Sequence, residues 1–202
     1  MTGALDYVMM SRRYHLCRIG LAACFVGLLA GCAGPSTIQE SAKLGDTSAL
    51  TRQLDAGANI NARDSAGYTA LHWAAYAGQL DAARILVQHG ANLEARENGG
   101  LTPLEVAVCY FHPDIAQFLL EKGANVDAKD RNGWTPLDYA ASNNDVQMAE
   151  LLIDFGANTR AVDYSGETAL TIAYKYRARD MVGVLTDPTL VRVPPLRRTI
   201  MR

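Results

Sequence analysis

The stretch Gly67-Tyr-Thr-Ala-Leu-His-Trp-Ala-Ala75 decides the fold, because the chain repeats its pattern three more times at a spacing of 33 residues. In each copy a glycine is followed by a threonine two residues later, a leucine four residues later and an alanine seven residues later. These positions are Gly67, Gly100, Gly133 and Gly166; Thr69, Thr102, Thr135 and Thr168; Leu71, Leu104, Leu137 and Leu170; and Ala74, Ala107, Ala140 and Ala173. A fixed period of this length indicates stacked structural units, each of which buries its apolar face only against its neighbours.

Each unit is predicted to contain a tight turn, a first helix, a short loop and a second helix. The glycine that opens the unit supplies the positive φ of the turn, and the threonine after it is a helix N-cap. Pro103 and Pro136 stand at the first helical position, where a missing N–H costs little. A Gly-Ala-Asn triplet, which begins at Gly57, Gly90, Gly123 and Gly156, ends each second helix with a left-handed glycine.

Thr-Pro-Leu at 102–104 and 135–137, with Thr-Ala-Leu-His at 69–72, resembles the ankyrin repeat over residues 36–187. The resemblance implies an all-α ankyrin-repeat solenoid of stacked helix-turn-helix units joined by β-hairpin-like turns. Its expected parts are an N-terminal cap at 37–66, repeats at 67–99, 100–132 and 133–165, and a C-terminal cap at 166–187.

The resemblance also makes predictions for single positions. His72 is expected to tie neighbouring repeats together by hydrogen bonds, and Trp73 is expected to point between repeats as part of the core. Gly78 stands in the loop between the two helices of its unit. Phe111, Asn144 and Arg177 replace that glycine in later units, so we expect a locally distorted loop there.

Residues 1–31 are predicted to be a bacterial lipoprotein signal peptide. Three arginines precede the apolar run Ile19–Ala30, which is too short for a helix that spans a bilayer. Leu29-Ala30-Gly31-Cys32 resembles the lipobox, which implies cleavage before Cys32 and a lipid on its sulfur. The alternatives are an uncleaved signal anchor and an ordinary cleavage near Ala33. Met1, Met9 and Met10 are all candidate start sites.

Residues 32–36 are predicted to be the lipidated cysteine and a short linker, which reaches at most about 18 Å. Ala33 after the cysteine implies, by the lipoprotein sorting rule, the outer membrane on its periplasmic side. Residues 188–202 form a basic tail that we expect to be disordered; the alternative is contact with the acidic body or with anionic lipid headgroups.

Charge and composition exclude several functions. Of the 19 lysines and arginines, three precede Cys32 and four follow Thr186, which leaves 12 against 19 acidic residues in between. An acidic body argues against a nucleic-acid partner. Neither a catalytic motif nor a repeated metal-ligand set is present, and Cys109 is the one cysteine of the body, interpreted as a buried inert thiol. We therefore predict no cofactor, no metal, no small-molecule substrate and no enzymatic activity.

The resemblance implies that another protein binds in a concave groove, which turn tips and the inner ends of the first helices form. The matching positions of this chain are Tyr68, Tyr76, Leu101, Tyr110, Trp134, Asn143, Tyr164 and Tyr176. Aromatic residues are over-represented at interface hot spots; packing within the groove wall is the alternative. The expected function is capture of a protein, as an immunity protein against a toxin or as a helper of a periplasmic enzyme. The other candidates are a structural envelope protein that self-associates through its exposed end, and an enzyme that uses Cys109.

Overall fold

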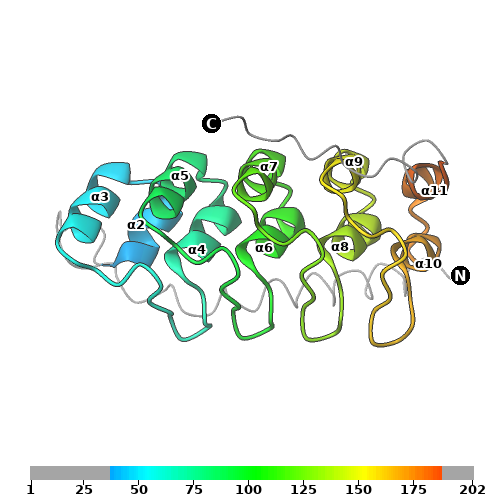
Figure 1. Ribbon diagram of the computed structural model, residues 1–202, viewed down its shortest axis with the longest axis horizontal. Coiled ribbons are helices and arrows are strands. Elements are labelled where there is room, and N and C mark those ends of the chain that lie inside the picture. The colour runs from blue at the N-terminus through cyan, green and yellow to red at the C-terminus, as the bar shows by residue number, and fades with distance from the viewer. Residues whose placement is uncertain (1–36, 188–202) are drawn as a thin grey trace, which may run out of the picture. The chain divides into compact units, whose positions relative to one another are not determined.

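The computed structural model describes residues 37–187, which form a row of helix pairs (Figure 1). These residues all belong to the second of the two units into which the chain divides. The predicted signal peptide, Cys32 with its linker and the basic tail lie outside the described residues. Within residues 37–187 the chain forms ten helices and no strand, which confirms the all-α class.

The helices lie in two layers (Figure 1). The inner layer contains α2 (Ile38–Leu44), α4 (Ala70–Ala77), α6 (Pro103–Cys109), α8 (Pro136–Asn143) and α10 (Ala169–Lys175). The outer layer contains α3 (Thr47–Asp55), α5 (Leu80–Gln88), α7 (Pro113–Glu121), α9 (Val146–Asp154) and α11 (Arg179–Thr186). Each inner helix packs against the next inner helix and against the outer helix that follows it in the chain. An arm of irregular backbone leads from each outer helix to the next inner helix.

The repeated residues explain why these elements form. Thr102 Oγ1 caps α6 by accepting a hydrogen bond from the Glu105 backbone N–H, and Thr135 caps α8 through Asp138 N–H in the same way. The alanines of the repeat have no exposed surface at all four positions (74, 107, 140 and 173). Their small side chains allow adjacent inner helices to approach closely, and the repeated leucines fill the space between them.

Glycine is required at the arm tips for two reasons. Gly100 and Gly133 have φ values of 93° and 80°, in the left-handed region. The next arm also packs directly on them: a Cβ on Gly100 would lie 2.9 Å from Arg131 N, and one on Gly133 would lie 2.8 Å from Tyr164 N. A side chain at either glycine would therefore push the arms apart.

The loops between inner and outer helices are not distorted, so that expectation from the sequence was wrong. Phe111, Asn144 and Arg177 have φ values of 60°, 54° and 58°, close to the 72° of Gly78. The left-handed backbone is thus kept without glycine, at a cost of roughly 1–2 kcal/mol for an ordinary residue. At Gly78 a Cβ would lie 2.7 Å from the imidazole of His112, so a side chain there would have to displace that ring.

Phe111→Gly is expected to raise the free energy of unfolding by roughly 0.5–1 kcal/mol, since relief of the left-handed strain exceeds the extra backbone entropy of glycine. Asn144→Gly is the matched control and should be destabilising. Asn144 Oδ1 accepts a hydrogen bond from Met181 N–H, and Asn144 Nδ2 donates to Asp180, each at 3.2 Å. Urea unfolding followed by circular dichroism measures both, and a loss of stability in Phe111→Gly would contradict the strain.

Candidate protein-binding surface

The arms are rigid because a carboxylate closes the base of each one. Asp130 Oδ1 accepts the backbone N–H groups of Asn132 and Trp134, both at 2.8 Å, and Asp64 and Asp163 do the same in their arms. Backbone hydrogen bonds also join one arm to the next, as between Tyr164 N–H and Asn132 O at 3.1 Å. The arms therefore form a continuous wall below the inner helices, with little freedom to move on binding.

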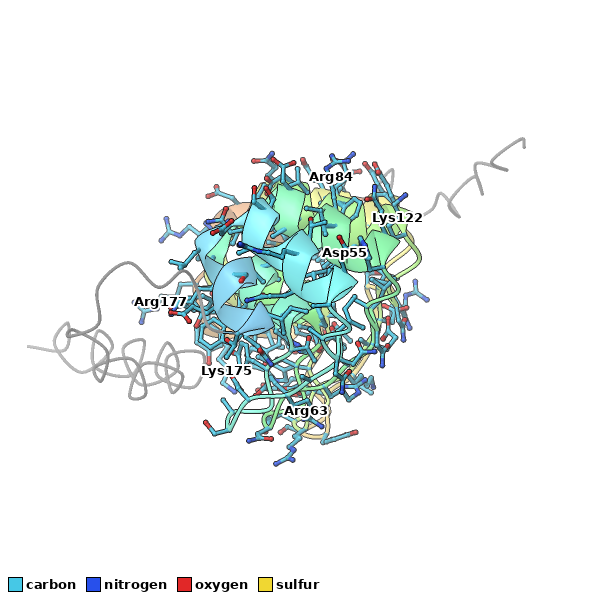
Figure 2. The ribbon with its side chains drawn as sticks, turned by 90° about the vertical axis from the view of Figure 1, so that its left-hand side faces the viewer. Asp55, Arg63, Arg84, Lys122, Lys175 and Arg177 are labelled. Carbon is cyan, nitrogen blue, oxygen red and sulfur yellow. The ribbon has the colours of Figure 1, made fainter. Side chains whose placement is uncertain are left out.

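We call the surface of the inner helices that faces away from the outer layer, together with the arm tips, the inner face. A view along the row separates it from the rest of the array (Figure 2). Arg84 lies on α5 and Lys122 at the C-terminal end of α7, Arg63 lies among the arms, and Lys175 lies on the inner face. The C-terminal ends of the inner helices bring the predicted residues Tyr76, Tyr110, Asn143 and Tyr176 to this face, all of them partly exposed.

Four aromatic rings meet on the N-terminal half of the inner face. This aromatic cluster consists of Tyr68, Trp73, Tyr76 and Tyr110. The ring centroids are 5.2 Å apart for Tyr68 and Trp73, 5.4 Å for Trp73 and Tyr76, and 4.4 Å for Tyr76 and Tyr110. The last two contacts are edge-to-face, the arrangement that the charge distribution of aromatic rings favours. Tyr76 and Tyr110 come from consecutive repeats, so the cluster spans a repeat junction. It is a preformed apolar platform whose rings need little ordering on binding.

Trp73, which was expected in the core, packs against the core but is only partly buried, and its ring belongs to this cluster. Its indole Nε1 donates to Asp64 Oδ2 at 2.8 Å, and the Lys43 ammonium lies 4.5 Å from the ring centroid. The indole nitrogen thus bonds the base of the arm while the ring packs against the core. The sequence signal was the spacing of Trp73 and Tyr76, three residues apart and hence on one face of a helix.

Three of the predicted binding residues are buried at the bases of the arms. Tyr68 is 8% exposed, Leu101 is 7% exposed and Trp134 is 8% exposed. They occupy one repeat position and pack against the hydrophobic core. So little accessible area leaves them almost no direct contact with a partner, and we assign them to the support of the inner face.

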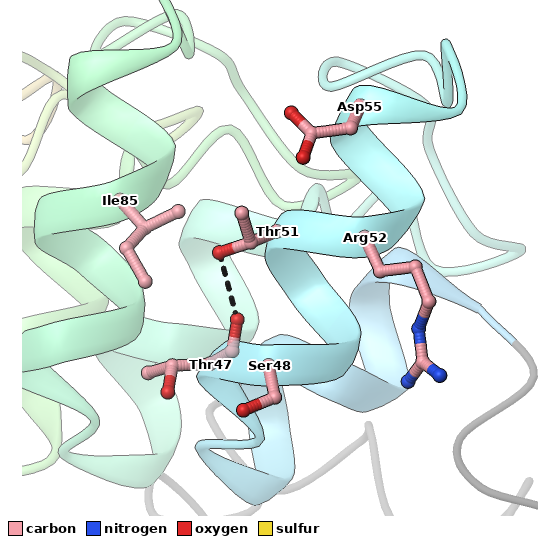
Figure 3. A pocket seen from close by; sticks show the side chains of 6 residues that line it. All are labelled: Thr47, Ser48, Thr51, Arg52, Asp55 and Ile85. Atoms are coloured by element: carbon pink, nitrogen blue, oxygen red, sulfur yellow. Dashed lines mark hydrogen bonds between the residues drawn. The ribbon is translucent and has the colours of Figure 1, made fainter.

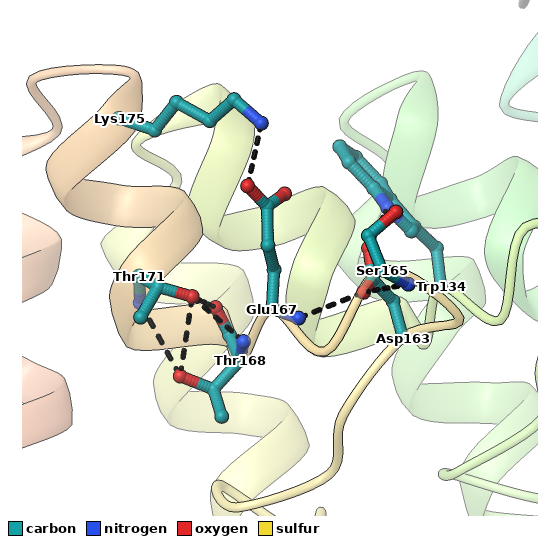
Figure 4. Close-up of polar contacts among 7 residues, drawn as sticks. All are labelled: Trp134, Asp163, Ser165, Glu167, Thr168, Thr171 and Lys175. Atoms are coloured by element: carbon teal, nitrogen blue, oxygen red, sulfur yellow. Dashed lines mark hydrogen bonds and ion pairs between the residues drawn. The ribbon is translucent and has the colours of Figure 1, made fainter.

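Trp134 joins two arms (Figure 4). Its indole Nε1 donates to Asp163 Oδ2 of the next arm at 3.0 Å, and its ring lies edge-to-face with Tyr139, with centroids 5.1 Å apart. Burial raises the pKa of Asp163, but hydrogen bonds from the N–H groups of Glu167 and Ser165 and from Trp134 outweigh burial and lower it. The carboxylate therefore stays ionised as the acceptor that holds both arms.

The C-terminal half of the inner face is polar. Asn143 occupies the repeat position that Tyr110 occupies one repeat earlier. Lys175 Nζ forms an ion pair with Glu167 at 2.6 Å (Figure 4). The predicted residue Tyr164 is 73% exposed at the tip of the last arm, against Gly133. The predicted set is thus divided: aromatic residues gather on the N-terminal half, and Tyr164 and Tyr176 lie apart from them.

Other features carry no candidate site. Cys109 is buried and forms no disulfide, and no three metal-ligating side chains converge within residues 37–187. None of the helices in this range is both long and apolar enough to cross a bilayer. An open depression of about 520 Å³ lies between α3 and α5 on the outer layer, lined by Thr47, Ser48, Thr51, Arg52, Asp55 and Ile85 (Figure 3). The Thr51 hydroxyl there already donates to Thr47 O at 2.9 Å.

Comparison with known protein families agrees with this architecture. The family model described as "Ankyrin repeats (3 copies)" matches residues 38–130 and, a second time, residues 123–191. A search of curated proteins gives no match. Ankyrin arrays are in general protein-interaction modules rather than enzymes. With matches that cover most of the chain and with the same turn, helix and arm in every unit, the chain belongs to the ankyrin-repeat family.

Proposed function

We propose that this protein captures another protein on the N-terminal half of its inner face while a lipid holds it to the bacterial envelope. The observation that carries the proposal is the aromatic cluster. Three of its rings are partly exposed, and their contacts with one another and with Asp64 hold them in place before any partner arrives. Rigid aromatic side chains supply the largest share of binding energy at interfaces for the least loss of conformational entropy.

Support for the anchor comes from the sequence alone. Leu29-Ala30-Gly31-Cys32 ends an export-type leader, and Ala33 favours the outer membrane with the array facing the periplasm. The first helix begins at Ile38, six residues after Cys32, so a lipid on that cysteine would hold the array within about 20 Å of the membrane. Cys32→Ser should release the protein from the membrane fraction. Unchanged membrane association would contradict the anchor but not the binding surface.

Two kinds of partner suit the proposal. One is a toxin that acts in the envelope, which the array would block as an immunity protein. The other is a periplasmic enzyme that the array would assist. A gene for an effector or for an enzyme beside the gene of this protein distinguishes them.

Site-specific photocrosslinking in intact cells tests the proposed surface. A photoreactive amino acid in place of Tyr110 on the inner face should give one discrete crosslinked protein. The same group in place of Arg84, exposed on α5, is the matched control and should not give that product. Equal yields of that product from both positions, or a product from position 84 alone, would move the binding surface to the outer helices.

Self-association through the C-terminal end is the second candidate, and one observation favours it. Tyr174 is 61% exposed, whereas the equivalent Ala75, Val108 and Ala141 are fully buried by the following repeat. Leu170 beside it on α10 is also partly exposed. Mass measurement of the Cys32→Ser chain decides between the candidates. A dimer that Tyr174→Asp dissociates would support self-association, and a monomer at working concentration would end it.

A further inference from the structure

One buried position links each full repeat to the next through the third residue of its inner helix. In the first full repeat this residue is His72, which is fully buried. Its Nδ1 accepts the N–H of Thr69 at 3.2 Å, so the proton of the neutral ring is on Nε2. Nε2 lies 3.1 Å from Leu101 O and donates to it across the repeat junction. This confirms the role that the sequence predicted for His72.

The next two repeats have a carboxylic acid at this position. Glu105 Oε2 accepts the N–H of Thr102 at 2.7 Å and its hydroxyl at 2.8 Å; Asp138 Oδ2 makes the same two bonds to Thr135. The second oxygen of each acid is buried without any hydrogen-bond partner, and these are the only such side-chain atoms in the described range 37–187. An ionised oxygen in that situation carries a large desolvation penalty.

The repeat register indicates what faces the orphaned oxygen of Glu105. His72 bonds the carbonyl of Leu101, 29 residues ahead, and the same step from Glu105 leads to Trp134. The two carbonyls are otherwise equivalent: Leu101 O accepts the N–H of Glu97 at 3.0 Å, and Trp134 O accepts the N–H of Asp130 at 2.9 Å. A carbonyl oxygen has two lone pairs and can accept a second hydrogen bond. Leu101 O accepts its second hydrogen bond from His72.

We propose that Glu105 holds a proton in the folded array and donates it through Oε1 to the carbonyl of Trp134, joining the second full repeat to the third. Asp138 is the shorter version of the same device at the following junction, opposite Glu167 O. Ionisation of Glu105 removes the proton that Oε1 donates, and the charged Oε1 then repels the carbonyl oxygen of Trp134. The junction under the middle of the inner face is therefore weaker at alkaline pH, while the junction that His72 makes is not.

The charges around Glu105 agree with a neutral side chain. Burial raises the pKa of Glu105 to about 7 and outweighs the hydrogen bonds from Thr102; of the nearby charges, Arg96 lowers the pKa and Asp130 raises it. On the packed helices, His72 of α4 is neutral and Asp138 of α8 is itself a buried acid. The charged residues of α7, Asp114 and Glu121, and its C-cap Lys122 are all exposed.

The sign of the pH effect follows from these directions. A pKa that folding raises from 4.5 to about 7 gives stability that is complete below 4.5 and is lost as the pH rises through 7. Burial raises the pKa of Asp138 to about 6, so its contribution to stability is lost as the pH rises through 6. Burial lowers the pKa of His72 to about 4, so the effect of His72 has the opposite sign: stability is lost as the pH falls from 6.5 to 4. Asp138 and His72 still titrate near pH 6, so the contribution of Glu105 is isolated by comparing the parent chain with a Glu105 variant between pH 6 and 8.

Urea unfolding of the full chain in mild detergent, with and without Glu105→Gln, tests the proposal. The glutamine amide can accept from Thr102 and donate to Trp134 at every pH. The unfolding equilibrium constant of the parent chain should rise about tenfold from pH 6 to pH 8 through this group. Glu105→Gln should abolish that rise and should exceed the parent in stability at pH 8. Glu121→Gln, on the exposed face of α7, is the matched control and should keep the rise.

An unchanged pH dependence in Glu105→Gln, or a variant less stable than the parent at pH 8, would overturn the proposal. A second measurement does not depend on the folding of any variant. Carbon-13 NMR of the parent chain follows the Glu105 side-chain carboxyl directly through a pH titration. A midpoint near 7 is expected, and a midpoint below 5 would show that the carboxyl is ionised and that no donor is present.

Discussion

Trp134→Ala is expected to lower the free energy of unfolding by about 3–5 kcal/mol, the usual cost of truncating a buried aromatic side chain. The substitution opens a cavity at the base of the third arm, where the ring is 8% exposed. It also removes the indole donor from Asp163, which joins two arms at 3.0 Å. For a domain of this size the loss corresponds to a fall in Tm of roughly 10 °C. Thermal unfolding followed by circular dichroism measures it.

Two further variants separate packing from hydrogen bonding at this site. Trp134→Phe keeps most of the buried ring and loses only the bond to Asp163, so it should cost about 1–2 kcal/mol. Tyr164→Ala removes a 73% exposed ring from the tip of the next arm and should change stability by less than about 0.5 kcal/mol. A loss of less than about 1 kcal/mol in the free energy of unfolding for Trp134→Ala would show that the indole is not buried. Trp134 would then be available for direct contact with a partner, as the sequence predicted.

Much of the fold could be predicted because its determinants are local. A threonine two residues after a glycine caps a helix whatever the rest of the chain does, and the glycine itself is needed where two arms touch. The period of 33 then places each such unit against a copy of itself. The loops at Phe111, Asn144 and Arg177 were wrongly expected to be distorted, because the repeat imposes the left-handed conformation even on residues that disfavour it.

The two tryptophans show where prediction from the sequence failed. Trp134 was expected on the binding surface but is buried, and Trp73 was expected in the core but packs against it while staying partly exposed. The burial of Trp134 depends on Asp163, which is 29 residues away and belongs to the next arm. The N-terminal cap places the ammonium of Lys43 over the ring of Trp73. Both are contacts between repeats, and a reading of one repeat at a time does not contain them.

The buried acids show a second limit of the sequence. In the sequence, Glu105 and Asp138 are visible only as residues that replace the histidine of the first repeat. That one oxygen of each is left without a partner follows from the geometry of the cap, in which Thr102 and Thr135 use the other oxygen twice. No pattern of residue types contains that information.

Tyr76→Ala combined with Tyr110→Ala is expected to weaken partner binding at least 30-fold, or about 2 kcal/mol, the threshold of a hot spot. The two rings are in contact at 4.4 Å across a repeat junction, so a partner that covers one also covers the other. Both are partly exposed, which limits the effect on folding. Because the rings support each other, the double variant should lose less than the sum of the two single losses.

The most direct test of the account is the affinity of the crosslinked partner, once identified, for three purified chains: the parent, the Tyr76→Ala and Tyr110→Ala double variant, and Tyr174→Ala. Tyr174 is the matched control, an exposed tyrosine on the end of the array away from the aromatic cluster. We predict a loss of at least 30-fold for the double variant, with its thermal unfolding shifted by only a few degrees, and no loss for Tyr174→Ala. Equal affinity of the parent and the double variant would show that the partner does not bind the aromatic cluster.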